Sequence, residues 1–328
     1  MALRFEGVAY AIAASETVLQ TLLRHGVPMP HSCTVGACQI CLLRSVGAAP
    51  PAIAQQGLRD TLRQQGYFLA CQCPAENRME LMLPRVSEVF FRALVSVKER
   101  LGQDHCRLLL TPTADLEYRP GQFLNLRRAD GLMRSYSIAS VPRCDTMIEL
   151  HIQRRREGAM SQWIIDTLQV GDAIDIQGPN GACFYLPDRK QDPLLLIGTG
   201  TGLAPLMGIA RDALSGGHQG PVYLYHGSQS MAGLYRRPQL TQLAAQYQNF
   251  HAHFCASGSD VESDCIAGRA NDIAFARHAD LSGFRVYLCG MPAMVYAAKK
   301  MAYLHGAQMQ DIYADPFENK DLRDAPRN

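Results

Sequence analysis

Four cysteines in the first quarter of the chain constrain its folding more than any other feature of the sequence. Cys33, Cys38 and Cys41 lie close together, and Cys71 follows after twenty-nine intervening residues. The small residues at 36–37 leave room for backbone N–H groups to approach sulfur atoms. Because thiolates are ligands of soft metals, the spacing predicts a metal centre held by one tight loop and one distant cysteine.

The spacing also separates two kinds of metal centre. A zinc site normally combines two Cys-x2-Cys or Cys/His pairs, and only Cys38 and Cys41 have that spacing. Cys-x4-Cys-x2-Cys with a distant fourth cysteine is the plant-type ferredoxin arrangement for a 2Fe-2S cluster. Zinc remains open as the alternative metal, and Cys73 remains open as the alternative to Cys71 for the fourth ligand. Residues 3–83 resemble the plant-type ferredoxin domain, which implies a β-grasp fold.

The segment before the cysteines has the pattern of a hairpin followed by a helix. Residues 3–12 alternate loosely, and residues 18–23 place apolar side chains on one helical face. We expect Ser15 to cap this helix and Gly26 to end it.

Six segments in the middle of the chain have the composition of β-strands. They are residues 89–97, 106–111, 123–127, 135–139, 148–153 and 173–177. Even spacing of short strands is typical of a small closed barrel, here a six-stranded antiparallel one. Residues 84–88 are predicted to be the linker that precedes it.

One of these strands carries side chains suited to a phosphorylated, planar cofactor. Arg134 can bind phosphate through paired donors, Tyr136 can stack, and Ser137 can donate. Four segments here resemble the ferredoxin-NADP reductase superfamily in order and spacing: Pro120–Phe123, Arg134–Ser137, Gly158–Ser161 and Gly178–Gly181.

The resemblance implies that the barrel binds FAD. Arg134 would hold the flavin pyrophosphate, Tyr136 would stack on the flavin, and Ser137 would donate toward flavin N5. A helix beginning near residue 158 would meet the phosphates with its free N–H groups. The further FAD-binding residues are Ser135, His151, Gly158, Ala159, Met160 and Ser161.

An unbroken apolar run at residues 194–197 leads into a glycine-rich turn and a helix that extends to about residue 214. Such a run is typical of a buried parallel strand, and glycines permit close approach of the backbone to a pyrophosphate. The turn matches neither the Rossmann fingerprint nor a phosphate loop. The prediction therefore depends on its position between strand and helix, and on a second turn at Cys289–Pro292.

Both turns resemble the nicotinamide domain of the same superfamily, with a parallel-sheet α/β fold. The implied dinucleotide-binding residues are Gly198, Thr199, Gly200, Thr201, Gly202, Pro205 and Gly290. Cys289 would lie near the nicotinamide ring. Asp315 and Phe317 resemble the terminal segment that brings an acid and an aromatic ring to the flavin. With Ser137, these three residues form the predicted catalytic group, and Phe317 is also a predicted cofactor contact.

The resemblance covers the whole chain and implies three domains: a ferredoxin domain at 1–86, an FAD domain at 87–188 and a nicotinamide domain at 189–328. It implies the reductase component of a multicomponent bacterial oxygenase, similar to those of naphthalene-type aromatic-ring dioxygenases. Electrons would pass from NAD(P)H through FAD and the 2Fe-2S cluster to a terminal oxygenase or a separate ferredoxin. Two alternatives remain open. The acceptor could be a diiron or haem monooxygenase, or the protein could be a redox-sensing or docking protein without turnover.

The resemblance favours NADH over NADPH. Residues 227–237 contain no carboxylate to accept a ribose hydroxyl, however, and Ser228 with Arg236 or Arg237 could instead meet a 2′-phosphate. NADPH therefore remains open as the alternative.

The composition excludes several other classes of protein. A net charge of +2 favours neither nucleic acid nor an anionic membrane. A mean hydropathy of −0.10 and the lack of an apolar run of about 20 residues argue against a membrane span. Residues 1–6 do not begin a secretory signal, and eleven cysteines, an odd number, argue against a disulfide framework. We expect a cytoplasmic monomer.

Overall fold

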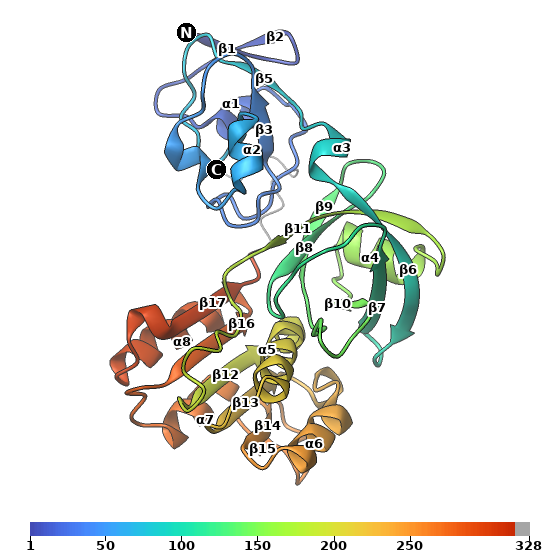
Figure 1. Ribbon diagram of the computed structural model, residues 1–328, viewed down its shortest axis with the longest axis vertical. Helices are drawn as coiled ribbons and strands as arrows, with labels where there is room; N and C mark the ends of the chain where they lie inside the picture. Colours follow the sequence, from blue (N-terminus) through green and yellow to red (C-terminus); the bar gives the residue numbers. More distant parts are fainter. Residues whose placement is uncertain (319–328) are drawn as a thin grey trace.

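The computed structural model describes residues 1–318, which form three lobes that follow one another along the molecule in chain order (Figure 1). Each lobe is built on its own β-sheet. The predicted third domain extends to residue 328, so its residues 319–328 lie outside the described part. Within residues 1–318, every helix is too short or too polar to cross a bilayer.

The first lobe has the predicted β-grasp fold. Its elements are β1 Ala2–Phe5, β2 Val8–Ala11, α1 Val18–Arg24, β3 Leu42–Ser45, η1 Ala52–Gln55, α2 Asp60–Gln64, β4 Tyr67–Leu69 and β5 Glu80–Met82. The strand order is β2-β1-β5-β3-β4, with β1 and β5 parallel and the other neighbours antiparallel. Helix α1 packs Val18, Leu19 and Leu22 into the core of this lobe.

The start of α1 differs from the prediction. Thr17, not Ser15, is the N-cap: its hydroxyl accepts from the Gln20 N–H at 3.2 Å, and the Gln20 side chain accepts from the Thr17 N–H at 2.8 Å. This reciprocal pair satisfies two N–H groups that one serine could not. Ser15 adopts a φ of 62° and lies outside the helix.

The second lobe is the predicted six-stranded antiparallel barrel. Its elements are α3 Val86–Val89, β6 Phe91–Arg100, β7 His105–Pro112, β8 Phe123–Arg127, β9 Met133–Ser137, β10 Ile148–Gln153, α4 Ala159–Asp166 and β11 Ala173–Asn180. The strand order is β10-β7-β6-β11-β8-β9. A bridge between Ile138 and Leu150 closes the sheet. Helix α3 begins in the predicted linker and extends to Val89, so the first strand starts at Phe91 and not at the predicted residue 89. Helix α4 packs Met160 and Ile164 into the barrel core.

The third lobe has the predicted parallel sheet, with strand order β15-β14-β13-β12-β16-β17. Its elements are β12 Leu194–Thr199, η2 Gly200–Gly202, α5 Leu203–Ser215, β13 Val222–Ser228, η3 Met231–Gly233, α6 Arg237–Gln246, β14 Phe250–Ala256, β15 Ile266–Ala267, α7 Ala270–Arg277, β16 Arg285–Gly290, α8 Pro292–Leu304, η4 Met309–Asp311 and β17 Ile312–Pro316. Leu194 and Leu196 enter one hydrophobic cluster, whereas Leu195 and Ile197 enter another. Both faces of β12 are therefore buried, which explains its unbroken apolar run.

The strand order reverses at β12, which has β13 on one side and β16 on the other. Ligands of open α/β sheets bind at the carboxyl ends of strands at such a switch point. Helix α5 leaves this point and packs against the barrel (Figure 1). A Cβ at Gly208 of α5 would lie 3.0 Å from the Ala139 carbonyl oxygen, so glycine permits the close approach.

Candidate functional site

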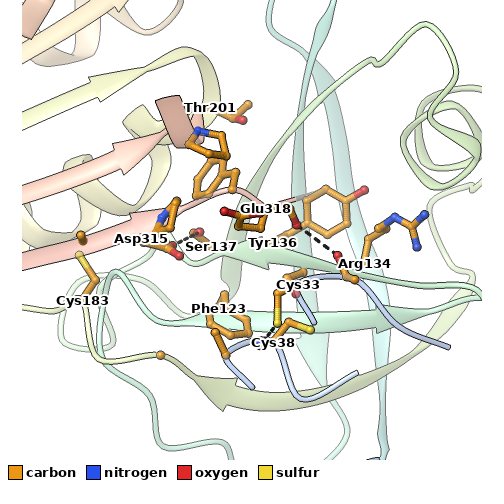
Figure 2. Close-up of a pocket in the computed structure, with 18 of the residues that line it drawn as sticks. Cys33, Cys38, Phe123, Arg134, Tyr136, Ser137, Cys183, Thr201, Asp315 and Glu318 are labelled. Carbon is orange, nitrogen blue, oxygen red and sulfur yellow. Dashed lines mark hydrogen bonds between the residues drawn. The ribbon is translucent and has the colours of Figure 1, made fainter. Parts of the chain in front are cut away.

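A cavity of about 1130 Å³ lies where all three lobes meet, between the cysteine loop, β9 and the end of β17 (Figure 2). The predicted site residues that line it are Cys33, Cys38, Arg134, Ser135, Tyr136, Ser137, His151, Gly158, Met160, Ser161, Thr201, Asp315 and Phe317. Its two sides are also joined directly, because the Ser32 hydroxyl donates to the Glu318 carbonyl oxygen at 3.2 Å. The fold thus brings the cysteine loop of the first lobe and the last described residues of the third lobe to one site.

Other predicted site residues lie outside the cavity wall. They are Cys41, Cys71, Ala159, Gly198, Thr199, Gly200, Gly202, Pro205, Cys289 and Gly290. Cys41 and Cys71 are buried in the core of the first lobe. Most of the others belong to the two turns of the third lobe, which pack against each other behind the wall.

The four predicted cluster ligands are buried and form two pairs. The Cys38 thiol is hydrogen-bonded to Cys33, and the Cys41 thiol to Cys71. The hydrogen bond from Cys38 lowers the pKa of Cys33 to about 5, and that from Cys41 lowers the pKa of Cys71 to about 7. The backbone N–H of Cys38 also donates to the Cys33 sulfur at 3.3 Å. One thiolate is therefore favoured in each pair, and thiolates are the form that binds metal.

Paired thiolates fit a 2Fe-2S cluster, in which each iron takes two cysteine ligands. A tetrahedral zinc site would need the side chains to converge on one point, and within residues 1–318 no group of three or more His, Cys, Asp or Glu side chains does so. Cys73 is fully buried, and its thiol is directed to the Pro74 carbonyl oxygen. Burial raises the pKa of Cys73 to about 12. Both observations favour Cys71 as the fourth ligand.

The flavin-binding residues predicted on β9 face the cavity from the barrel (Figure 2). The Ser137 hydroxyl donates to Asp315 Oδ2 at 3.2 Å, which joins β9 to β17. Burial raises the pKa of Asp315 to about 6. A guanidinium, a phenol and a hydroxyl–carboxyl pair thus line a space large enough for a dinucleotide-sized ligand. These groups fit FAD, because a guanidinium suits its phosphates and a phenol ring suits stacking on the flavin.

The start of α4 forms a second part of this wall. Gly158 is its N-cap and has no side-chain cap. The Ser161 hydroxyl accepts from the Arg155 N–H at 3.1 Å and donates to the Gly158 carbonyl oxygen at 3.0 Å, so it closes the turn. A Cβ at position 158 would lie 2.5 Å from this hydroxyl. The uncapped N–H groups that remain suit a phosphate.

The two turns of the third lobe are packed backbone to backbone. A Cβ at Gly202 would lie 2.2 Å from the Cys289 carbonyl oxygen, and one at Gly290 would lie 2.7 Å from the Thr199 carbonyl oxygen. These glycines therefore serve the contact between the turns. Of the predicted residues in the glycine-rich turn, Thr201 is the one that lines the cavity.

Cys289 is fully buried, and its sulfur lies 3.7 Å from that of Cys183. Cys183 lines the cavity and was not singled out from the sequence, although it follows the Gly178–Gly181 motif by two residues. Met291, Tyr296 and Glu318 also line the cavity and were missed. Met291 lies within the second turn, but Tyr296 carries no signal in the sequence.

A buried polar cluster joins the barrel to the third lobe. The Tyr235 hydroxyl donates to His151 Nδ1 at 3.0 Å, and His151 Nε2 donates to Glu149 at 2.8 Å. Burial raises the pKa of Glu149, but hydrogen bonds from His151 and from two arginines outweigh it and keep the pKa below its usual range. Both nitrogens of His151 are thus occupied, although the residue borders the cavity. His226 Nε2 donates to the Gly200 carbonyl oxygen at 3.2 Å, and His105 stacks on Tyr235.

The two arginines considered for a 2′-phosphate are both paired with carboxylates. Arg236 donates to Glu149 at 2.7 Å. Arg237 donates to Glu262 at 2.9 Å and also pairs with Asp264. The carboxylates that pair with Arg237 thus come from the segment after β14, and the one that pairs with Arg236 comes from β10 of the barrel.

Three known domain families match successive parts of the chain. The 2Fe-2S iron-sulfur cluster binding domain matches residues 4–76, the oxidoreductase FAD-binding domain matches residues 92–185, and the oxidoreductase NAD-binding domain matches residues 196–300.

Several relatives match this chain over nearly its whole length. The ferredoxin–NAD(P)(+) reductase component of the naphthalene 1,2-dioxygenase system of Pseudomonas putida is 31% identical, over 93% of this chain and 94% of that protein. The reductase subunit of an aromatic O-demethylase of Amycolatopsis is 35% identical, over 92% and 94%. The crystal structure of an Amycolatopsis cytochrome P450 reductase superposes with a TM-score of 0.70 and 30% identity, over 96% and 98%. The chain therefore belongs to the ferredoxin–NAD(P)+ reductases of aromatic oxygenase systems, with 2Fe-2S, FAD-binding and NAD-binding domains in one polypeptide.

Proposed function

We propose that this NAD(P)H oxidoreductase draws electrons from NADH and delivers them, through FAD and its 2Fe-2S cluster, directly to an oxygenase component or to a separate ferredoxin. The observation that carries the proposal is the shared cavity, because the cysteine loop, the flavin strand and the C-terminal acid all line it. FAD, when bound, takes electrons in pairs and releases them singly, as a 2Fe-2S acceptor requires.

The residues of the barrel side would bind and orient FAD. Arg134 would hold its pyrophosphate together with the N-terminus of α4, and Tyr136 would stack on the ring. The Ser137 hydroxyl would donate toward N5, and Asp315 would receive or supply a proton at Oδ2. A carboxyl with a pKa of about 6 can do either near neutral pH.

The residues of the third lobe would place the nicotinamide. The turns at 198–202 and 289–292 lie at the switch point of the sheet, and Thr201 reaches the cavity from the first of them. Cys289 would act indirectly, because it is fully buried and its sulfur contacts that of Cys183, which lines the cavity. Phe317 lines the same cavity and would cover the flavin until nicotinamide replaces it.

The ion pairs of Arg236 and Arg237 support a preference for NADH. A 2′-phosphate would have to displace carboxylates from these guanidinium groups. We expect kcat/KM to be higher for NADH, and a ratio above about ten in favour of NADPH would overturn the preference. Replacing both Glu262 and Asp264 with their amides should raise kcat/KM for NADPH while leaving that for NADH within about twofold.

In this proposal, the protein that accepts the electrons takes part in the degradation of aromatic compounds. A haem monooxygenase is the second candidate, because the relatives include a cytochrome P450 reductase and an aromatic O-demethylase subunit. We further propose that the protein is a cytoplasmic monomer.

Two measurements test the proposal. Iron, sulfide and flavin analysis should give one FAD and one 2Fe-2S cluster per chain, and zinc without iron would refute it. Adding NADH without oxygen should bleach the flavin and cluster bands within seconds, whereas a sensor or docking protein without turnover would retain them. Mixing the reduced protein with oxygenase components, ferredoxins and P450 enzymes encoded beside it then identifies the acceptor by reoxidation.

A further inference from the structure

The side chain of Asn125 forms a direct link between the barrel and the cysteine loop. Asn125 lies in the middle of β8 and is fully buried. Its neighbours Leu124 and Leu126 point into the barrel core, so Asn125 points outward, toward the first lobe. Its Nδ2 donates to the Cys38 carbonyl oxygen at 2.7 Å. Cys38 is one of the predicted cluster ligands.

The same amide is held by both neighbouring strands. Asn125 pairs in register with Ser135 on β9 and with Gln177 on β11. The Ser135 hydroxyl donates to Asn125 Oδ1 at 2.6 Å, and Asn125 Nδ2 also donates to Gln177 Oε1 at 2.6 Å. Ser135 lines the cavity. A continuous chain of hydrogen bonds therefore runs from the flavin strand to the backbone of a cluster ligand.

The peptide that accepts this hydrogen bond adopts an unfavourable conformation. Gln39, which follows Cys38, has a φ of 58°, which is uncommon for a residue with a side chain. Such conformations persist where the surroundings determine them. Asn125 holds this peptide from the barrel side, and Gln39 Nε2 donates to the Gly57 carbonyl oxygen at 2.9 Å on the other. Met133 of β9 packs against Cys33 and Cys38 beside it.

We propose that Asn125 is a positioning residue for electron transfer between FAD and the 2Fe-2S cluster, with its amide fixing the Cys38 segment to the flavin strand. This inference rests on the proposed electron path. Electron transfer depends steeply on the separation of donor and acceptor, and small displacements of reacting groups are costly. A buried amide with both nitrogen donors and its oxygen engaged is suited to hold that separation constant.

Two substitutions test the amide. Asn125→Asp keeps its shape and the acceptor for Ser135 but cannot donate to Cys38 when ionised, and Asn125→Leu removes all polar contacts. The matched control is Arg59→Ala. Arg59 donates to the Gly178 carbonyl oxygen at 2.7 Å, so this change deletes a bond between the same two lobes that ends outside the cysteine loop.

The first readout needs no turnover: hydrogen–deuterium exchange of residues 33–41 in the oxidised protein. Exchange should rise about tenfold in the Asn125 variants and stay at the wild-type rate in Arg59→Ala. The second is rapid-mixing absorbance after addition of NADH. Electron arrival at the cluster should slow about tenfold or more, while flavin reduction stays within about twofold.

Several outcomes would overturn the proposal. One is unchanged exchange and unchanged cluster reduction in Asn125 variants that retain FAD and cluster. Another is an equal effect of Arg59→Ala, which would assign the role to lobe docking in general. Loss of FAD from both Asn125 variants would show that the amide supports the flavin barrel instead. If wild-type protein failed to reduce its cluster with NADH, the proposed function would fail, whereas the exchange result would still test Asn125.

Discussion

At the scale of single residues, the contact between Ser137 and Asp315 carries the most chemistry. The two residues lie 178 positions apart in the chain, and β9 and β17 bring them to 3.2 Å. Asp315 is more readily protonated than a carboxyl in water, because burial disfavours its charge. In the proposed function this single group supplies protons at the cavity wall, and its titration also bears on the stability of the protein.

The raised pKa of Asp315 predicts a pH dependence of stability. The folded pKa of about 6 exceeds the ordinary aspartate value of 3.8, so the folded state binds more protons between these values. The resulting stabilisation is full below pH 3.8 and is lost as pH rises through 6. Between pH 5 and 8 the loss is on the order of 1 kcal/mol, and Asp315→Asn should not show it. Urea unfolding at both pH values measures this. The exposed control Asp115→Asn should lose stability over this pH range as the wild-type protein does. An equal loss in Asp315→Asn would contradict the assignment.

At the scale of elements, strand positions were largely predictable. The strands at 123–127 and 148–153 have the predicted bounds, because alternating or continuous apolar residues report directly which faces are buried. The start of α1 was predicted two residues early, because a capping box depends on a pair of side chains rather than on one suitable residue.

The site was predictable only where a motif lies on one segment. The cysteine loop and β9 were found in this way. Asn125, Cys183 and Tyr296 were not, because their roles arise from register and from contacts between lobes. Likewise, the carboxylates that pair with Arg237 come from a distant segment, which no local pattern indicates.

The end of β17 leads to a prediction about Phe317. Its backbone N–H donates to the Gly290 carbonyl oxygen at 2.8 Å, which holds the residue at the cavity. If its ring covers the flavin, Phe317→Ala should tighten binding of oxidised dinucleotide and slow product release. Aromatic stacking worth on the order of 1 kcal/mol corresponds to about fivefold in affinity. Titration with NAD+ measures the change. Loss of FAD or a lower melting temperature with unchanged NAD+ affinity would instead mark Phe317 as a packing residue.

At the scale of the whole molecule, the three lobes form one route for electrons, and Cys41 tests its order. Cys41→Ser should abolish electron delivery to protein acceptors by destroying the cluster, while ferricyanide reduction by the flavin remains mostly intact. Cys73→Ser is the matched control, because Cys73 is equally buried in the same core but stands outside the two cysteine pairs. It should retain the cluster and both activities. A simultaneous fall of both activities in Cys41→Ser, with FAD retained, would refute the order.

The interface between barrel and third lobe predicts sensitivity to acid. Burial lowers the pKa of His105 and of His226 to about 4. Each histidine therefore contributes stability that is present above its unfolded pKa near 6.5 and is lost as pH falls toward 4. Between pH 7 and 5 the loss is about 2 kcal/mol for each. The glutamine side chain in His226→Gln can still donate to the Gly200 carbonyl oxygen. Between pH 7 and 5 this variant should therefore lose about 2 kcal/mol less stability than the wild type, as measured by urea unfolding. An unchanged loss in this variant would contradict the prediction.

Because the cysteine loop forms part of the cavity wall, the presence of the cluster affects how the flavin is enclosed when the protein is assembled. Cys33 and Cys38 line the cavity, and the loop between them is held by backbone N–H groups of Val35 and Cys38 that donate to the Cys33 sulfur. We therefore expect that a chain without its cluster would enclose the flavin less completely, because this part of the wall would lose the group that its cysteines hold. In a cell short of iron, newly made chains would hold a flavin open to oxygen, and NADH would then be spent on peroxide. Coupling synthesis of this protein to iron supply would prevent that leak.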